Sequence, residues 1–516
     1  MKGPPPPTTA PRRRPRALPT LLLGVSVALA GCASRLPATN AAAEVAVPTR
    51  WSEGGADQAQ SPTSLVSWWQ RFGDAQLSAL IEDGLRHSPT VHAAVAALRQ
   101  SRALADVARA GYSPNVTGSS SAQRSRTASA GTTNTFAVGL NASWEPDLFG
   151  ATRAGVSAAE ADARAAQMSL GNVQISLAAE IALAYIDLRD QQARLTIAER
   201  NLASQDDTLQ ITRWRQQAGL VSALDVEQAA TSAEQTRAQV PVRQAARDQA
   251  RHRLALLTGR APGTLAALGN APVPLPPDDL VMAFPADTLR QRPDVQQTEA
   301  QVRAAWARLV QADAARYPTF SLSGSLGLQA LTLGGLTAGG ALVRTLAAGL
   351  SLPIFDGGAI NATVRAQQAA YEQARANHQS SVLTALQDVE DALVALQGDR
   401  ARIGSLQAAA SAAERADALA RQQYQAGLID FATVLTSQRT LLSAQDSAAS
   451  VRASLANDHV ALYKALGGGW APTSADSDPA TDASANANAG TVPGADAAPE
   501  PTAAIVATPI SNAAAR

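Results

Sequence analysis

Residues 144–150 read Trp-Glu-Pro-Asp-Leu-Phe-Gly, and residues 351–357 read Ser-Leu-Pro-Ile-Phe-Asp-Gly. Each stretch follows a segment in which apolar residues alternate with small polar ones. Each also precedes a very long segment with apolar residues at helical spacing. A change of period from 2 to 3.6 marks the passage from a strand to a helix. The same order of parts therefore occurs twice in this chain.

Other short matches extend this duplication over most of the chain. The matched pairs are 87–91 with 291–295, 112–114 with 317–318, 218–221 with 426–429, and 257–259 with 465–467. The offset runs from 204, between Pro89 and Pro293, to 208, between Gly219 and Gly427. A period so far above 20–50 residues argues against a solenoid and for a duplicated domain. We expect one repeat over 87–265 and a second over 287–470, joined by a linker over 266–286.

The N-terminus is typical of an exported lipoprotein. Five basic residues precede the apolar stretch Leu18 to Leu29, which is too short to span a bilayer. The stretch ends Leu-Ala-Gly-Cys, which resembles a bacterial lipobox, and Cys32 is the only cysteine. The resemblance implies that residues 1–31 are a signal peptide and that Cys32 is the site of lipid (palmitate) attachment. In such lipoproteins Asp after the cysteine often signals retention in the inner membrane, so Ala33 favours the outer membrane.

The composition excludes several other classes of protein. Of the 43 basic residues five lie in the signal peptide, so 38 basic residues face 43 acidic ones in the mature chain. Such a balance offers no basic surface for nucleic acid. A single cysteine leaves no internal disulfide. No stretch after the leader approaches 18 continuous apolar residues, so no transmembrane helix is expected.

Helical periodicity dominates both repeats. After a linker and equatorial segment over 32–86, long helices are expected at about 150–215 and 221–258, and again at about 358–425 and 430–466. The glycines Gly219 and Gly427 suit the reversals between antiparallel helices. A helix of 65 residues is about 100 Å long at 1.5 Å per residue, enough to cross a periplasm. Residues 471–516 consist mainly of small and polar residues and are interpreted as a disordered tail.

Alternating segments predict four strands, at about 114–123, 135–145, 319–329 and 343–353. One apolar and one small polar face is the pattern of a membrane barrel, although a β-hairpin on a helical body would show it too. Four strands cannot close a barrel, and open edges are not tolerated in lipid. The chain must therefore assemble if these strands span a membrane; two copies would give eight strands and three would give twelve.

With these features in order, the chain resembles the TolC-like outer membrane factors, in the lipoprotein branch of tripartite efflux systems related to OprM and NodT. The resemblance covers about residues 65–470. The segments that carry it are Trp68-Trp69 with Phe72-Gly73-Asp74, Arg292 to Val295, Ala315 to Pro318, Pro353 to Gly358, and Tyr424 to Gly427.

The resemblance implies a mainly α fold with a membrane β-barrel contribution: a homotrimer with a 12-stranded barrel on a 12-helix α-barrel. It implies a passive duct in the outer membrane that extends into the periplasm. The implied partners are a periplasmic adaptor protein, an inner-membrane pump and outer-membrane lipid. The implied cargo is small solutes such as drugs or metals.

The resemblance also implies a periplasmic gate at the helix tips. Tyr424 and Asp225 match positions that help to hold the inner helix pair shut. The family's tip arginine is replaced by Ile429, and its pore-facing aspartates by Thr433 and Thr436. Asp430 is then the nearest acidic candidate. Asp225 and Asp430 have a second interpretation, as first-turn or N-cap acids that the helix dipole favours.

Catalytic and metal-binding patterns are not evident. The five histidines form no pair at i, i+4 and no His-Glu-x-x-His motif, so neither enzymatic activity, a metal site nor a cofactor other than the lipid is expected. Three functions stay open: an efflux duct, the outer-membrane exit duct of a protein secretion system, and a periplasmic coiled-coil lipoprotein without a pore. The alternating strands disfavour the third.

Overall fold

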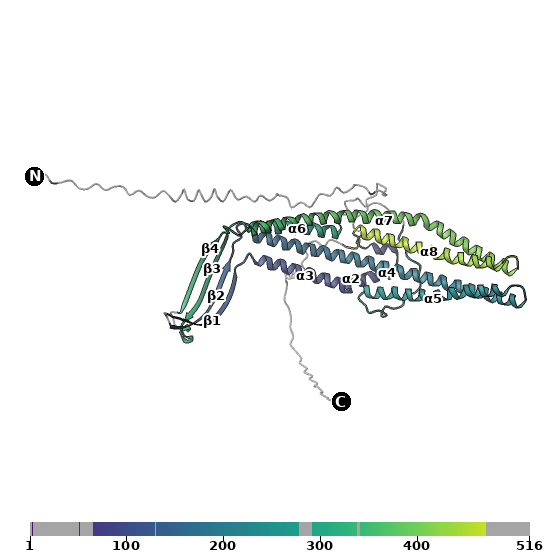
Figure 1. Ribbon diagram of the computed structural model, residues 1–516, viewed down its shortest axis with the longest axis horizontal. Helices are drawn as coiled ribbons and strands as arrows, with labels where there is room; N and C mark the ends of the chain where they lie inside the picture. Colours follow the sequence, from purple (N-terminus) through teal and green to yellow (C-terminus); the bar gives the residue numbers. More distant parts are fainter. Residues whose placement is uncertain are drawn as a thin grey trace, which may run out of the picture. The chain divides into compact units, whose positions relative to one another are not determined.

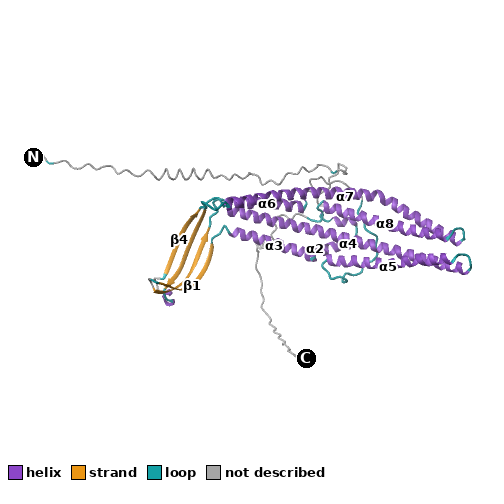
Figure 2. Cartoon of the chain, viewed as in Figure 1, coloured by secondary structure: helices purple, strands orange, loops and turns teal. Residues whose placement is uncertain are grey.

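The computed structural model describes residues 65–128, 131–277, 291–337 and 341–470, together with Gly3 and Trp51. Apart from Gly3, the predicted signal peptide lies outside the described residues, and so do Cys32, the tail over 471–516 and part of each linker. Figure 1 shows the order of the elements along the chain, and Figure 2 separates helices from strands.

The equatorial segment before repeat 1 contains a short 3-10 helix, η2 (Trp68–Phe72), and α2 (Ala75–His87). The described part of repeat 1 contains α3 (Pro89–Ala110), β1 (Asn115–Thr127), β2 (Gly131–Trp144), α4 (Ala151–Gln217) and α5 (Ala223–Leu257). Repeat 2 contains α6 (Pro293–Ala314), β3 (Thr319–Ala330), the 3-10 turn η5 (Leu333–Thr337), β4 (Leu342–Ser351), α7 (Ala359–Gln425) and α8 (Phe431–Ala465). The chain is thus mainly helical with a small sheet.

The helices begin where their capping residues allow. Pro89 and Pro293 occupy the first turns of α3 and α6, where a missing N–H costs nothing. Gly150 and Gly358 precede α4 and α7 with left-handed φ angles of 83° and 88°. Since only glycine takes this conformation freely, these two residues fix the sharp passage from strand to long helix.

The helices lie side by side in one layer. Near the strands the contacts follow the order α3, α4, α6, α7; near the hairpin turns α5 and α8 contact α4, and α8 also contacts α7. The strands are likewise arranged in chain order, in one antiparallel sheet β1-β2-β3-β4. Among the described residues no strand pairs with the outer edge of β1 or of β4. The helix layer and the sheet therefore each have two open edges.

One described helix is long and apolar enough to cross a membrane by length and composition alone. It is α4, and 56% of the window that meets this test is buried within the protein. The sequence expectation concerned unbroken apolar runs, which is a stricter criterion than the mean hydropathy of a window, so it is not contradicted by α4. Its alanine-rich stretch near Ala178 and Ala182 is fully buried, as in a helix at the centre of a core.

The largest hydrophobic core surrounds the middle of α4. Trp68 stacks on Tyr463 of α8, with ring centroids 5.1 Å apart. The buried guanidinium of Arg189 donates to Gln76 Oε1 at 2.6 Å and to the hydroxyl of Tyr185 at 2.6 Å. Burial, with a hydrogen bond to Asp74, raises the pKa of Tyr185 to about 12. This network ties the segment before repeat 1 to the long helix.

Candidate functional site

Both helix hairpins end in the same turn. Gly219 and Gly427 have φ angles of 73° and 76°. The amide of Leu220 donates to the carbonyl of Arg215 at 2.8 Å, and that of Leu428 donates to Gln423 at 2.9 Å. These six-to-one bonds are those of a Schellman motif, in which glycine occupies the left-handed position.

Tyr424 lies inside the tip and joins the two hairpins. Its side chain is buried, and the guanidinium of Arg215 lies 4.6 Å from its ring centroid. Arg215 also donates a hydrogen bond to the Tyr424 carbonyl oxygen. The Tyr424 hydroxyl lies 3.3 Å from Thr212 Oγ1. Since Arg215 and Thr212 belong to α4, Tyr424 connects the end of α7 to the end of α4.

Within the described chain no hydrogen bond or ion pair joins Tyr424, Asp225 and Asp430 to one another. The Asp225 carboxylate accepts from the backbone N–H of Ser222 at 3.1 Å and forms the capping box of α5. Asp430 caps α8 and accepts from the amide of Thr433 at 2.9 Å. The capping interpretation therefore describes both acids here, because an N-terminal turn offers a carboxylate unpaired N–H groups. Their role in a gate stays a prediction.

The two predicted gate threonines form a neutral surface. The Thr433 hydroxyl donates to Asp430 Oδ1 at 2.6 Å, and the Thr436 hydroxyl donates to the carbonyl of Ala432 at 2.9 Å. The hydrogen bonds from the Thr433 side chain and amide lower the pKa of Asp430. Both threonines line a shallow pocket of about 470 Å³ whose other lining residues are also uncharged.

Apolar packing holds the two tips against each other. This tip cluster consists of Leu209, Ala229, Ala233, Tyr424, Phe431, Val434 and Leu435. Ile429 packs against it. The position at which the resemblance implied an arginine thus contributes apolar contact instead.

Sequence reasoning missed Arg215 and a buried carboxylate above the tip. Asp417 is fully buried, pairs with Arg421 at 2.8 Å and accepts from Ser437 at 3.1 Å. The i, i+4 spacing of Asp417 and Arg421 was a signal for this pair. Nothing in the local sequence distinguishes Arg215 from an ordinary cation in the last turn of a helix.

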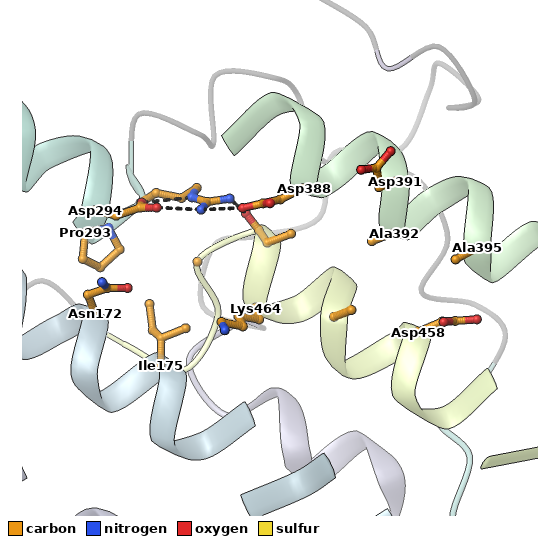
Figure 3. A pocket seen from close by; sticks show the side chains of 14 residues that line it. Asn172, Ile175, Pro293, Asp294, Asp388, Asp391, Ala392, Ala395, Asp458 and Lys464 are labelled. Atoms are coloured by element: carbon orange, nitrogen blue, oxygen red, sulfur yellow. Dashed lines mark hydrogen bonds and ion pairs between the residues drawn. The ribbon is translucent and has the colours of Figure 1, made fainter. Parts of the chain in front are cut away.

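A polar cavity of about 380 Å³ lies where α6 begins and α8 ends. Arg292 donates to both carboxylate oxygens of Asp294, at 3.0 and 2.6 Å, and to Asp388 at 3.1 Å. It also donates to the carbonyl of Ala465, the last residue of α8, at 2.7 Å. Figure 3 shows Asp294 and Asp388 on either side of this guanidinium. The Arg-Pro-Asp motif therefore joins α8 to α6.

A pair of carboxylates lies near this cavity. Burial raises the pKa of Asp458 to about 6, and the neighbouring carboxylate of Asp399 contributes in the same direction. Asp458 lines the cavity (Figure 3). Among the described residues, no group of three histidine, cysteine or acidic side chains could hold a metal ion.

The sheet carries an apolar face that is exposed in the single chain. The register pairs Val138 with Leu328 and Leu140 with Leu326 on this face. Val138, Leu140 and Leu326 are each more than half exposed. The opposite face pairs Asn141 with Ser325 and consists of small and polar residues. A sheet with an exposed apolar face and a polar face matches a barrel wall between lipid and water.

The arrangement of long helix hairpins, apolar-faced strands and open edges defines a class of outer-membrane channel subunits. The family model of outer membrane efflux proteins matches residues 80–260 and 284–468. The chain belongs to the outer membrane efflux protein family, and the resemblance seen in the sequence is confirmed.

Individual relatives match over most of their length. Nodulation protein T of Rhizobium leguminosarum bv. viciae is 32% identical over 86% of this chain and 93% of its own. The pyoverdine export outer membrane protein OpmQ of Pseudomonas aeruginosa is 30% identical over 83% of this chain and 92% of its own. The solved outer-membrane channel OprN superposes with a TM-score of 0.76 at 32% identity, covering 85% of this chain and 98% of that one.

Proposed function

We propose that this protein is the outer-membrane channel of a tripartite efflux pump. Three copies close a 12-stranded barrel and a 12-helix tube, which form a passive duct for small molecules across the periplasm and outer membrane. A periplasmic adaptor and an inner-membrane pump deliver the solute. The protein needs no cofactor beyond the covalent lipid on Cys32.

The observation that carries this proposal is the pair of open edges. Unpaired backbone groups at a sheet edge cannot face lipid, so the exposed apolar face requires a closed ladder. Four strands per chain fall short of the eight or more of known membrane barrels. Three chains give twelve strands, and the four-helix layer continues around the same ring. A barrel of eight strands would be filled by its own side chains, which disfavours a dimer.

Assembly and conduction test the proposal directly. Detergent-extracted protein should have the mass of a trimer by native mass spectrometry and should form channels in planar bilayers. A deletion strain should accumulate small toxic solutes, and this phenotype separates an efflux duct from an exit for secreted protein. A monomer without conductance would overturn the proposal.

Lipid attachment has its own test. The Cys32→Ser variant should lose acyl labelling and leave an unprocessed or mislocalised precursor. The mature wild-type protein should carry a lipid adduct on Cys32 by intact-mass analysis. A mature chain without that adduct would contradict lipid anchoring at Cys32, whereas the proposed channel function would still stand.

A further inference from the structure

Arginines are the only charged residues in the four strands as the structure describes them. Arg124 and Arg126 lie in β1, Arg344 lies in β4, and all three are exposed. β1 and β4 are the two edges of the sheet. The three charges therefore lie where one subunit would meet the next.

All three arginines lie on the apolar face. Arg344 pairs with Leu326, which pairs with Leu140. Arg124 pairs with Asn134 and Ala122 with Phe136, at alternate positions of the same β1–β2 ladder. Since every second residue of a strand points to one face, the arginines share the face of Leu140 and Phe136. In a closed barrel this face contacts lipid.

Arg124 and Arg126 lie near the end of β1 that is farthest from the helices, and Arg344 is the third residue of β4, which begins on that side. Asn134, the partner of Arg124, is ten residues from Trp144 along β2. Ten residues rise about 34 Å, or about 26 Å along the membrane normal at a tilt of about 40°. The apolar band of such barrels is about 25 Å tall. Arg124 therefore comes just beyond the band on the outer side, where a charge costs little.

The internal duplication gives the register between subunits. The contact of β2 with β3 joins two repeats within a chain, and the contact of β4 with the next subunit's β1 would join two repeats between chains. β3 begins 204 residues after β1 (319 − 115). For β2 and β4 the offset is 208, as between Gly150 and Gly358, because only an even offset carries the face of Leu140 onto the face of Arg344; the offset of 207 in the sequence match would exchange the two faces. The observed pair Phe136 and Ala330 becomes Arg344 (136 + 208) opposite Arg126 (330 − 204).

A separate estimate gives nearly the same register. Arg344 is in line with Gly118 of its own chain, through Leu326 and Leu140. Strands tilted by roughly 35–45° stagger by about four to six residues over four strands, which brings Arg344 opposite residues 122–124 of the neighbour. The opposite direction of stagger would place most of β4 beside α3. Either estimate brings Arg344 next to Arg124 or Arg126.

Like charges directly across a ladder repel one another. An anion between them removes the repulsion, and guanidinium groups bind phosphate through two hydrogen bonds. On the duct proposed above, we propose that Arg344 of one subunit and Arg124 and Arg126 of the next bind the phosphate groups of an outer-leaflet lipid. Each trimer has three such sites.

Native mass spectrometry of the purified trimer tests this site. The probe is a hexa-acylated glycolipid with two phosphates, compared with the same lipid after enzymatic dephosphorylation. Wild-type trimer should retain up to three phosphorylated lipids and at least tenfold less of the dephosphorylated one. The Arg124→Gln, Arg126→Gln, Arg344→Gln triple variant should bind at least tenfold more weakly, and the matching Arg→Lys variant should recover most of the binding.

The matched control removes three exposed arginines from the helices: Arg237→Gln, Arg303→Gln and Arg415→Gln. It should bind the lipid as the wild type does. Equal binding of the two lipids, or equal binding by the Gln variant, would overturn the site while leaving the trimer intact. Absence of a wild-type trimer would instead overturn the duct, and the site with it. If the Gln variant fails to assemble, the comparison of the two lipids on wild type decides.

Discussion

The two long helices α4 and α7 have the same length, 67 residues, and the same place in their repeats, but different surroundings. About twice as many residues are buried on α4 as on α7. α4 contacts helices on both sides, whereas α7 forms an edge of the layer. Exposed apolar residues remain on α7, namely Leu383, Val394 and Leu419. They also remain on the opposite edge, in α3 and α5, namely Leu104, Val107, Leu224, Val242 and Leu256. Duplicated elements have thus diverged because only one of them is covered within its own chain.

The largest expected effect comes from placing charge on the free edge. The Leu383→Asp, Val394→Asp, Leu419→Asp variant should abolish the trimer, because an unpaired charge cannot be buried in an interface. Native mass spectrometry should find only monomers. The conservative variant Leu383→Met, Val394→Ile, Leu419→Met should assemble normally. A trimer that survives the three aspartates would show that α7 is not an interface helix.

The next effect concerns the tips, where the two hairpins meet. Arg215→Met removes the hydrogen bond to the Tyr424 carbonyl and the cation–π contact with its ring, and should raise single-channel conductance in planar bilayers. Asp225→Ala combined with Tyr424→Phe should also raise it, because loss of a cap costs about 0.5–2 kcal/mol per subunit. Threefold symmetry multiplies that cost. Unchanged conductance in all of these variants would reject a lock at the tips.

A smaller effect is a pH dependence of the free energy of unfolding, which arises from a carboxylate pair of α7 and α8 that the helices α4 and α5 lack. The repeat 1 equivalents of Asp399 and Asp458 are Gln191 (399 − 208) and Ala250 (458 − 208). Because the pKa of Asp458 is raised to about 6, the folded protein binds a proton more readily than the unfolded chain, whose aspartate pKa is near 3.9. Stability should rise as pH falls from above 6 to about 4. Solvent exposure limits this gain to about 1 kcal/mol.

The Asp458→Asn variant should have a melting temperature at pH 7.5 that is a few degrees above that of the wild type. On acidification to pH 4.5 the melting temperature of the wild type should rise, and the variant should lack most of this rise. Asp207→Asn, at an exposed acid of α4, serves as the control and should leave the pH profile unchanged. An Asp458→Asn profile identical to wild type would place the titrating group elsewhere.

The smallest expected effect concerns block of the channel by trivalent cations. With neutral threonines at 433 and 436, trivalent cations should block the channel only weakly. Asp430→Asn should remove what block remains, because Asp430 is the nearest ionised carboxylate. Strong block that survives Asp430→Asn would place an acidic constriction elsewhere in the duct.

Much of the fold follows from local sequence. Pro89, Gly219 and Gly427 stand at element ends, and the apolar spacing through Leu177 and Ile181 describes a buried helix face. The strand ends were less predictable: β1 runs to Thr127, beyond the expected 123. β1 is mainly small and polar and ends with Arg124 and Arg126, so its sequence gives little alternation from which to place its end. The backbone ladder with β2 nevertheless continues to Thr127, since pairing does not depend on side-chain type.

The candidate site was harder to predict because its contacts cross between hairpins. Tyr424 could be chosen by resemblance, but its partner Arg215 is about two hundred residues away and no periodicity relates them. Asp225 and Asp430 could be interpreted either as gate residues or as caps. Only the three-dimensional arrangement shows their hydrogen bonds to Ser222 and Thr433.

The repeated register of the sheet has an evolutionary consequence. If the β2–β3 contact inside the chain and the β4–β1 contact between chains are versions of one interface, the channel has six nearly equivalent parts. A gene half as long would then have encoded a homohexamer, and its fusion in tandem turned three of six identical junctions into covalently linked ones. Substitutions at the linked junctions and at the free ones could afterwards accumulate independently.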